Sequence, residues 1–86
     1  MQIMAEVRYA VVLEPCSPED GGGFTVTVPA LPEIVTEGKS VEEALVMARD
    51  AIELTLAARR DAGEDIPCSD ADTARLEIVA VTLPAA

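Results

Sequence analysis

The chain opens with an alternation of apolar and polar side chains that is typical of a half-buried strand. Over residues 4–14 the apolar side chains of one face are those of Val7, Tyr9, Val11 and Leu13. Because successive side chains of a strand point to opposite faces, this spacing predicts a strand that ends at Pro15. Residues 24–28 alternate again and predict a second strand, antiparallel to the first. Residues 33–37 predict a short third strand that ends at Gly38.

The segments between these strands are rich in residues that interrupt strands. Residues 15–23 contain two prolines and three consecutive glycines, Gly21 to Gly23. The glycines are followed neither by the Lys-Ser/Thr pair of a phosphate-binding loop nor by a helix, so we interpret them as a flexible hairpin connection. Pro29 and Pro32 follow the second strand, and both lack the N–H group that a strand donates to its neighbour.

One helix is predicted by separate signals at its two ends. Ser40, with Glu43 three residues later, forms a capping box in which the serine hydroxyl accepts a backbone hydrogen bond. Arg59 and Arg60 fall in the last turn, where the helix dipole favours cations, and Gly63 supplies the stop. Apolar side chains recur at helical spacing and form one stripe: Val41, Ala44, Leu45, Ala48, Ala51, Ile52 and Leu56.

Two further apolar surfaces point to self-association. Met47, Leu54 and Ala58 form a patch beside the helix stripe. Residues 74–83 predict a last strand that is apolar on both faces, and such a strand needs cover on both sides or a partner. We therefore expect a homo-oligomer, a dimer or tetramer, with these candidate contact residues: Met47, Leu54, Val79, Val81 and Leu83. The alternative is that the whole helix stripe packs on this chain's own sheet.

The predicted order is β-β-β-α-β, which belongs to the α+β class. We expect a small, mainly antiparallel sheet with one helix packed on a face. With 86 residues the chain fits one domain, residues 1–86. Because aromatic residues make up only 2% of the chain, the core must be built from aliphatic side chains. Such a thin core makes oligomerisation an attractive further source of burial.

The charge of the chain narrows the class of partner. The formal net charge is −10 and the pI is about 4.1, so direct binding to nucleic acid is disfavoured. A basic protein is a better match for this field, although an acidic surface also keeps a small domain soluble. Our candidates for contact with a partner are acidic side chains of the helix and the sheet end: Glu33, Glu37, Glu42, Glu43, Asp50 and Glu53.

The sequence offers little material for catalysis. It contains no histidine, so the commonest general base and the usual activator of a serine or cysteine nucleophile are missing. The carboxylates do not follow the spacing of a metal-binding loop. We therefore predict no catalytic residue, no cofactor and no metal site, and a protein that is not an enzyme. A metal-dependent enzyme is the competing hypothesis, and it predicts that activity is lost when Glu14 or Asp20 is replaced by alanine.

The cellular location is inferred from what the sequence lacks. Residues 1–10 do not resemble a signal peptide, and no apolar run approaches the ~18 residues of a transmembrane helix. Cys16 and Cys68 each lie beside a proline in a predicted loop, and a disulfide between them has no support in the pattern. We expect a cytoplasmic protein with reduced thiols and no membrane partner.

The ordered set of short motifs resembles the HicB family of bacterial antitoxins. The similarity spans about residues 9–67 and lies in Tyr9-Ala-Val-Val-Leu-Glu14, Asp20-Gly-Gly, Gly23-Phe-Thr-Val, Pro29-Ala-Leu-Pro32, Thr36-Glu-Gly38, Ser40-Val-Glu-Glu-Ala44, Ala51-Ile52 and Gly63-Glu-Asp-Ile-Pro67. The resemblance implies a partial RNase H-like, HicB-like fold without nuclease activity. It also implies a function: family members bind and block HicA, a small basic toxin that cleaves RNA.

The chain departs from the family pattern at three points. Family members commonly have Gly-Cys where this chain has Glu33-Ile34, and the first loop is longer here through residues 15–18. Many members also carry a C-terminal helix-turn-helix or ribbon-helix-helix that binds their operator. This chain reaches Ala86 without such a segment, so we expect no separate DNA-binding domain and no direct binding to DNA.

Two functions follow from the resemblance. The first is an antitoxin of a type II toxin-antitoxin system that neutralises a small basic HicA-like RNase by direct binding. The alternative is an orphan HicB-like module, structural or regulatory, that self-assembles without a toxin. An adjacent reading frame that encodes a short basic chain with a single histidine would favour the first.

Overall fold

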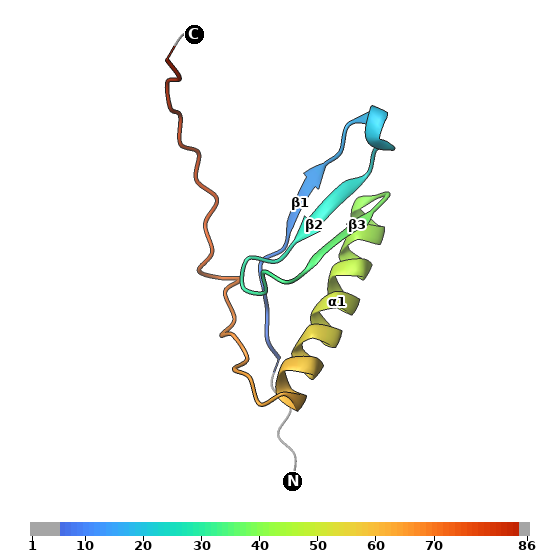
Figure 1. Cartoon of the computed structure of the whole chain (residues 1–86), viewed down its shortest axis with the longest axis vertical. Helices are drawn as coiled ribbons and strands as arrows, with labels where there is room; N and C mark the ends of the chain where they lie inside the picture. Colours follow the sequence, from blue (N-terminus) through green and yellow to red (C-terminus); the bar gives the residue numbers. More distant parts are fainter. Residues whose placement is uncertain (1–5, 85–86) are drawn as a thin grey trace.

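Three short strands and one long helix form two layers, which confirms the prediction of an α+β fold. The computed structural model describes residues 6–84. The elements are β1 (Val12–Pro15), the 3-10 turn η1 (Pro18–Asp20), β2 (Phe24–Thr27), β3 (Val35–Gly38) and α1 (Val41–Asp61). The sheet is antiparallel in the order β1-β2-β3, and α1 lies along one face of it (Figure 1).

The β1–β2 hairpin is shaped by the prolines and glycines of its loop. Leu13 pairs with Val26 in the register of the two strands, and the Cys16 N–H donates to the Gly23 carbonyl at 2.8 Å. All three glycines, Gly21 to Gly23, have positive φ angles, a backbone region that side chains with a Cβ rarely adopt. Glycine is therefore required at this turn for backbone reasons, in agreement with the predicted hairpin connection.

The first strand is shorter than the predicted span of residues 4–14. It begins at Val12, because β2 ends at Thr27 and leaves the preceding residues without a strand to pair with. After β2 the chain turns, with the Leu31 N–H donating to the Val28 carbonyl at 2.9 Å. Residues 6–11 are instead held by residues 67–71, as described below, and residues 4 and 5 lie outside the described part of the chain.

The helix begins and ends where the sequence predicts. The Ser40 hydroxyl accepts a hydrogen bond from the Glu43 N–H at 3.1 Å and caps the first turn. At the other end the Glu64 N–H donates to the Arg59 carbonyl at 2.8 Å, and the Gly63 N–H donates to the Arg60 carbonyl at 3.1 Å. With Gly63 at a φ of +72° this is a Schellman motif, which satisfies carbonyl groups that the helix leaves free.

The core lies between the sheet and one side of the helix, in two small clusters. Val26 packs with Ala44 and Ala48, and half-buried side chains from β1 and β2 complete that cluster. The second cluster is centred on the turn after β2 and contains Val28, Leu31 and Ile34, with partly buried contacts from Tyr9, Val11, Ala51, Ile52 and Leu56. Of the predicted helix stripe, Val41 and Leu45 remain half exposed.

Close contact between the two layers depends on Gly38. A Cβ atom at this position would lie 2.4 Å from the backbone nitrogen of Ala44, which is far inside van der Waals contact. Backbone atoms cannot move aside as the end of a side chain can, so the helix rests directly on the end of β3. Of the run Thr36-Glu-Gly38 that carries part of the resemblance, Gly38 thus has a packing reason.

The predicted strand over residues 74–83 is wrong for this structure. The segment is extended but pairs with no other strand among residues 6–84, and it leaves the body of the molecule (Figure 1). The radius of gyration of the Cα atoms is 16.2 Å, against about 12 Å for a compact domain of this length. We call residues 74–84 the tail and residues 6–73 the body. A strand requires the edge of another strand to pair with. An alternating pattern of side chains in the sequence does not show where that other strand lies.

The second face of the sheet is open. Val12, Thr27 and Val35 form one row across the three strands on this face, and Glu14, Thr25 and Glu37 form the next. In both rows the side chains are exposed or only partly buried. The helix covers the opposite face, so in the described part of the chain this face has no second layer over it.

Candidate partner-binding surface

Two of the predicted contact residues, Glu37 and Glu43, line one hollow. Its volume is about 240 Å³, and it lies between the hairpin tip, the end of β3 and the start of α1. Asp20 joins them from η1, and Lys39 lies at the same place. The fold thus brings together three acids that are as far as 23 residues apart in the sequence, because β3 returns antiparallel to β2 and the helix starts beside its end.

The end of the molecule around this hollow is strongly acidic. The segments 14–20 and 37–43 contain six carboxylates and one lysine, so their net charge of −5 is half of the chain's −10. We call these residues the acidic end: Glu14, Glu19, Asp20, Glu37, Lys39, Glu42 and Glu43. Glu42 and Glu43 lie in the first turn of α1, where the helix dipole favours anions, so the helix itself helps to hold negative charge here.

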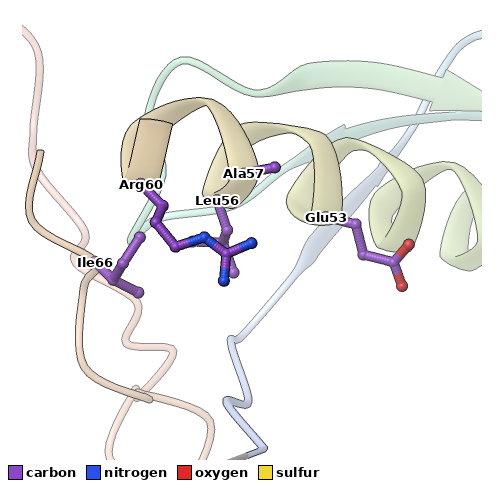
Figure 2. A pocket seen from close by; sticks show the side chains of 5 residues that line it. All are labelled: Glu53, Leu56, Ala57, Arg60 and Ile66. Atoms are coloured by element: carbon purple, nitrogen blue, oxygen red, sulfur yellow. The ribbon is translucent and has the colours of Figure 1, made fainter. Parts of the chain in front are cut away.

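Asp50 and Glu53 lie in different surroundings from the acids of the acidic end. They are exposed on the solvent side of α1, where Arg49 and Arg60 occupy neighbouring positions one or two turns away. Glu53 and Arg60 line the same hollow of about 290 Å³ near the C-terminal end of α1, together with Leu56, Ala57 and Ile66 (Figure 2). The field along this part of the helix is therefore of mixed sign.

Glu33 is bound within the fold by an arginine. Its two carboxylate oxygens accept hydrogen bonds from Arg59, at 2.8 Å from Nε and 2.7 Å from Nη2. The Arg59 side-chain hydrogen bonds hold the pKa of Glu33 below its ordinary value, and the same contact raises the pKa of Arg59. This bidentate pair joins the turn before β3 to the last turn of α1. Glu33 therefore has a structural role whether or not it touches a partner.

The residues predicted for self-association are accessible. Leu54 is 73% exposed and Met47 38% exposed on α1, and Val79, Val81 and Leu83 are exposed in the tail. The helix residues and the tail residues form two separate patches, because the tail extends away from the body. Either patch is open to a second copy of the chain in this structure.

Other sites were considered within the described residues. Among residues 6–84 no group of three or more histidine, cysteine, aspartate or glutamate side chains is arranged to hold a metal ion. Cys16 and Cys68 are free thiols, and the Cys16 sulfur lies 3.3 Å from the Thr25 hydroxyl. The helix found over residues 41–61 is not apolar enough to cross a membrane, and the described chain holds no other candidate.

A comparison with protein families decides the family of this chain. The family described as HicB_like antitoxin of bacterial toxin-antitoxin system matches residues 9–81, most of the chain. The chain belongs to the HicB-like antitoxins. This confirms the family indicated by the short motifs, and it extends the match from residue 67 into the tail.

Two relatives differ in how much of their own length this chain covers. The chain is 46% identical to Antitoxin HicB 1 of Photorhabdus laumondii over 50 residues, which are 58% of this chain and 30% of that protein. It is 32% identical to the UPF0150 protein Ta0767 of Thermoplasma acidophilum over 66 residues, 77% of this chain and 91% of the relative. The chain thus matches under a third of the first relative and nearly all of the second. No solved structure matches, so the RNase H-like comparison stays a prediction.

The sequence did not indicate which polar side chains hold the body together. The hydroxyl of Tyr9 donates to the Pro67 carbonyl at 2.5 Å, and burial, with the nearby Asp70 carboxylate, raises the tyrosine's pKa. Arg59 was expected only to offset the helix dipole, yet it also pairs with Glu33 across 26 residues. Such long-range pairs leave no local signal in a single sequence, because any of 16 acids is a candidate partner for each arginine.

Proposed function

We propose that this chain neutralises a small, basic, HicA-like RNase by direct binding, as part of a type II toxin-antitoxin system. Membership of the HicB-like antitoxins supports a toxin partner. The resemblance to HicB proteins implies that the toxin is of the HicA kind. The antitoxin's role in this proposal is that of a binding protein, which blocks the toxin and performs no chemistry of its own.

The observation that supports the contact surface is the concentration of charge at the acidic end. Half of the net negative charge lies there, and all six of its carboxylates are exposed, those that line the hollow included. A basic partner is attracted to such a surface before contact, and complementary charges then fix its orientation. Asp50 and Glu53 contribute less to this attraction because arginines lie among them. Glu33 contributes less because Arg59 already neutralises it.

The test compares two double charge reversals with the same change in charge. Glu37→Lys with Glu43→Lys alters the acidic end, and Asp50→Lys with Glu53→Lys alters the helix flank; each pair changes the formal charge from −10 to −6. The probe is the purified product of a short basic reading frame found next to the one for this chain; if there is none, the orphan module is the better hypothesis. Binding is measured by calorimetry at low and high salt, and inhibition by cleavage of RNA. Circular dichroism confirms that both variants are folded.

The expected result is that the first pair weakens binding by about tenfold or more and the second pair by clearly less. Higher salt should reduce the difference in affinity between the two variants, because it screens exposed charges. Equal losses would remove the acidic end as the preferred contact surface. A basic partner that neither binds nor loses RNase activity in the presence of this chain would overturn the proposed function, and the orphan module would then be the better hypothesis.

A further inference from the structure

The tail exposes more apolar surface than a strand in water normally does. Its large aliphatic side chains are each between 78% and 92% exposed: Leu76, Ile78, Val79, Val81 and Leu83. Single exposed aliphatic residues are ordinary, but five within eight consecutive residues form a contiguous apolar surface, which marks an interaction site. The family match extends through residue 81, so most of this segment belongs to the HicB-like domain itself.

Both faces of the tail are apolar. Leu76, Ile78 and Ala80 share one face of the extended chain, and Val79, Val81 and Leu83 share the other. A strand of this kind is stable only when both faces are covered. If the tail folded back beside its own β1, the helix layer would cover one face, and the other would stay in water with the open face of the sheet.

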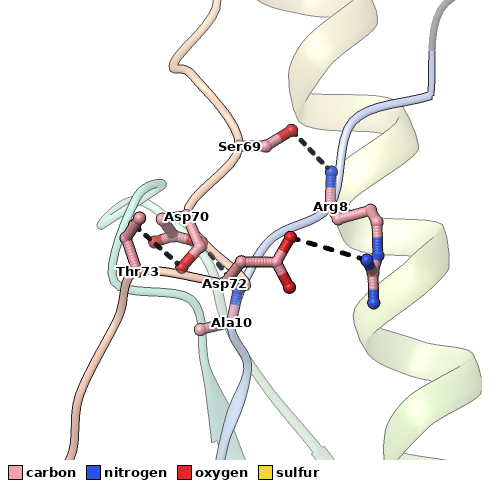
Figure 3. Close-up of polar contacts among 6 residues, drawn as sticks. All are labelled: Arg8, Ala10, Ser69, Asp70, Asp72 and Thr73. Carbon is pink, nitrogen blue, oxygen red and sulfur yellow. Dashed lines mark hydrogen bonds and ion pairs between the residues drawn. The ribbon is translucent and has the colours of Figure 1, made fainter.

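The root of the tail is fixed beside β1 by several hydrogen bonds. The Asp70 carboxylate accepts from the Ala10 N–H at 2.7 Å (Figure 3), and the Arg8 carbonyl accepts from the N–H groups of Asp70 and Ala71 at 3.0 and 3.1 Å. The Asp70 carbonyl then accepts from the Ala74 N–H at 2.7 Å, which closes a turn. The tail therefore leaves the body at a defined place and not from a loose end.

The edge of the sheet at β1 is a complementary surface. β1 is the outermost strand on its side, so its outward backbone groups have no ladder partner within residues 6–84. Beside it lies a mostly apolar hollow of about 380 Å³, lined on the body side by residues 10–13 and Pro29 and on the tail side by residues 74–76. An unpaired edge with apolar side chains beside it is where an additional strand binds.

We propose that the tail of one copy adds as a strand to the β1 edge of a second copy, and that the two copies exchange tails symmetrically. Ten extended residues span about 33 Å, comparable with the 29 and 24 Å widths of the molecule, so the tail is long enough to cross a neighbouring body. A two-fold arrangement places the same surfaces against each other in both directions and closes after two copies. Each tail then lies in the plane of the second copy's sheet, and the open sheet face of the tail's own copy, with Val12 and Val35, can pack against the tail's second apolar face.

The test is the oligomeric state of the full chain and of two matched variants. Val79→Lys with Val81→Lys alters the tail, and Met47→Lys with Leu54→Lys alters the helix patch. Each pair moves the net charge from −10 to −8, so charge repulsion between copies falls in both. Molar mass is measured by light scattering over a wide range of concentration, and circular dichroism checks that each variant is folded.

We expect the full chain at about 18 kDa, twice 9.0 kDa, the tail variant at 9.0 kDa and the helix variant unchanged from the full chain. A full chain that stays at 9.0 kDa at every concentration would overturn the proposal, as would a tail variant that keeps the full chain's mass. If both variants have a lower molar mass than the full chain, amide hydrogen exchange of the full chain tests whether the tail forms a strand. Protection of amides 76–82 that is lost when the full chain is diluted to 9.0 kDa supports the exchanged strand, and protection that is absent or independent of concentration overturns it. The inference does not depend on toxin binding, so each can fail alone.

Discussion

Leu31 and Leu76 are the same side chain in opposite surroundings, and the contrast divides the molecule into two regions. Leu31, in the turn after β2, is 0% exposed, whereas Leu76, in the tail, is 90% exposed. The body has its strands, helix and turns locked by hydrogen bonds and by one bidentate ion pair. The tail has a strand-like sequence, and no layer among residues 6–84 covers it. The stability of the isolated chain should therefore come from the body, and the tail should matter only when copies or partners meet.

The largest expected difference is between alanine substitutions of these two leucines. Leu31→Ala should lower the free energy of unfolding by about 2–5 kcal/mol, since it leaves a cavity in the second core cluster. Leu76→Ala should change it by no more than about 0.5 kcal/mol in dilute protein. Urea unfolding, followed by circular dichroism, measures both values.

Protein concentration sharpens this first comparison. If copies exchange tails, the loss caused by Leu76→Ala should grow as the concentration rises, because association then stabilises the folded chain. The loss caused by Leu31→Ala should be present at every concentration. A small, concentration-independent effect of both substitutions would show that the turn after β2 is not part of the core.

A second comparison adds atoms instead of removing them. Gly38→Ala places a Cβ atom against the backbone of Ala44 and should cost about 1–3 kcal/mol of unfolding free energy, since the helix must move away from β3. Ala80→Val adds two methyl groups to an exposed position of the tail and should leave dilute protein within about 0.5 kcal/mol of the parent. Thermal unfolding of the parent and the two variants measures these differences in stability. Equal midpoint temperatures for Gly38→Ala and the parent would contradict the close contact between β3 and α1.

A third comparison concerns two hydroxyl groups. Ser40→Ala removes the acceptor that caps α1 and should cost about 1 kcal/mol, whereas Ser40→Asp should retain the cap. Thr82→Ala removes an exposed hydroxyl from the tail and should have no measurable effect on the stability of dilute protein. Urea midpoints give the differences. If the urea midpoint of Ser40→Asp were as low as that of Ser40→Ala, the loss of stability would not arise from the cap.

The helix could be predicted accurately because its signals are local. Ser40, Glu43 and Gly63 lie within a few residues of the ends that they determine, and the structure places the caps at those positions. The second and third strands also agree with the prediction to within two residues, because prolines and glycines bound them. Local chemistry was sufficient where the partner of each backbone group lies nearby in the sequence.

The first strand and the tail could not be predicted in this way. The pattern of residues 4–14 shows two faces that differ in polarity, and the pattern of residues 74–83 shows two apolar faces. Neither pattern identifies the neighbouring strand that a strand also needs. For residues 6–11 the chain supplies polar contacts from residues 67–71 in place of a strand. For the tail the described chain supplies none, and we propose above that the missing neighbour is a second copy of the chain.

The candidate surface was predicted only as a set of acids. No sequence pattern distinguishes Glu37 and Glu43, which share a hollow, from Glu33, which is paired with Arg59. Sorting these charges requires the fold, because it depends on which segments lie side by side. The overall negative charge, by contrast, needs no structure, and it remains the strongest physical reason to expect a basic partner.

Two Arg–Glu ion pairs with the same 2.7 Å contact provide the finest comparison. Arg59–Glu33 lies in the body and joins residues 26 apart, while Arg75–Glu77 lies in the tail and is the more exposed of the two. An exposed pair two residues apart contributes little to stability. Glu77→Gln should therefore leave the unfolding free energy of dilute protein within about 0.5 kcal/mol of the parent.

Glu33→Gln should instead change how stability depends on pH. Hydrogen bonds from Arg59 lower the folded-state pKa of Glu33, so the ionised form stabilises the folded chain. This contribution is fully present above the ordinary glutamate pKa of 4.5 and is lost as the pH falls through the lower, folded-state pKa. The stability difference between the parent and Glu33→Gln should thus be largest near neutral pH and shrink below 4.5, as urea unfolding across that range would measure. A difference that stayed constant into acid would mean that Glu33 acts through packing alone, and the body would then differ from the tail in burial but not in electrostatics.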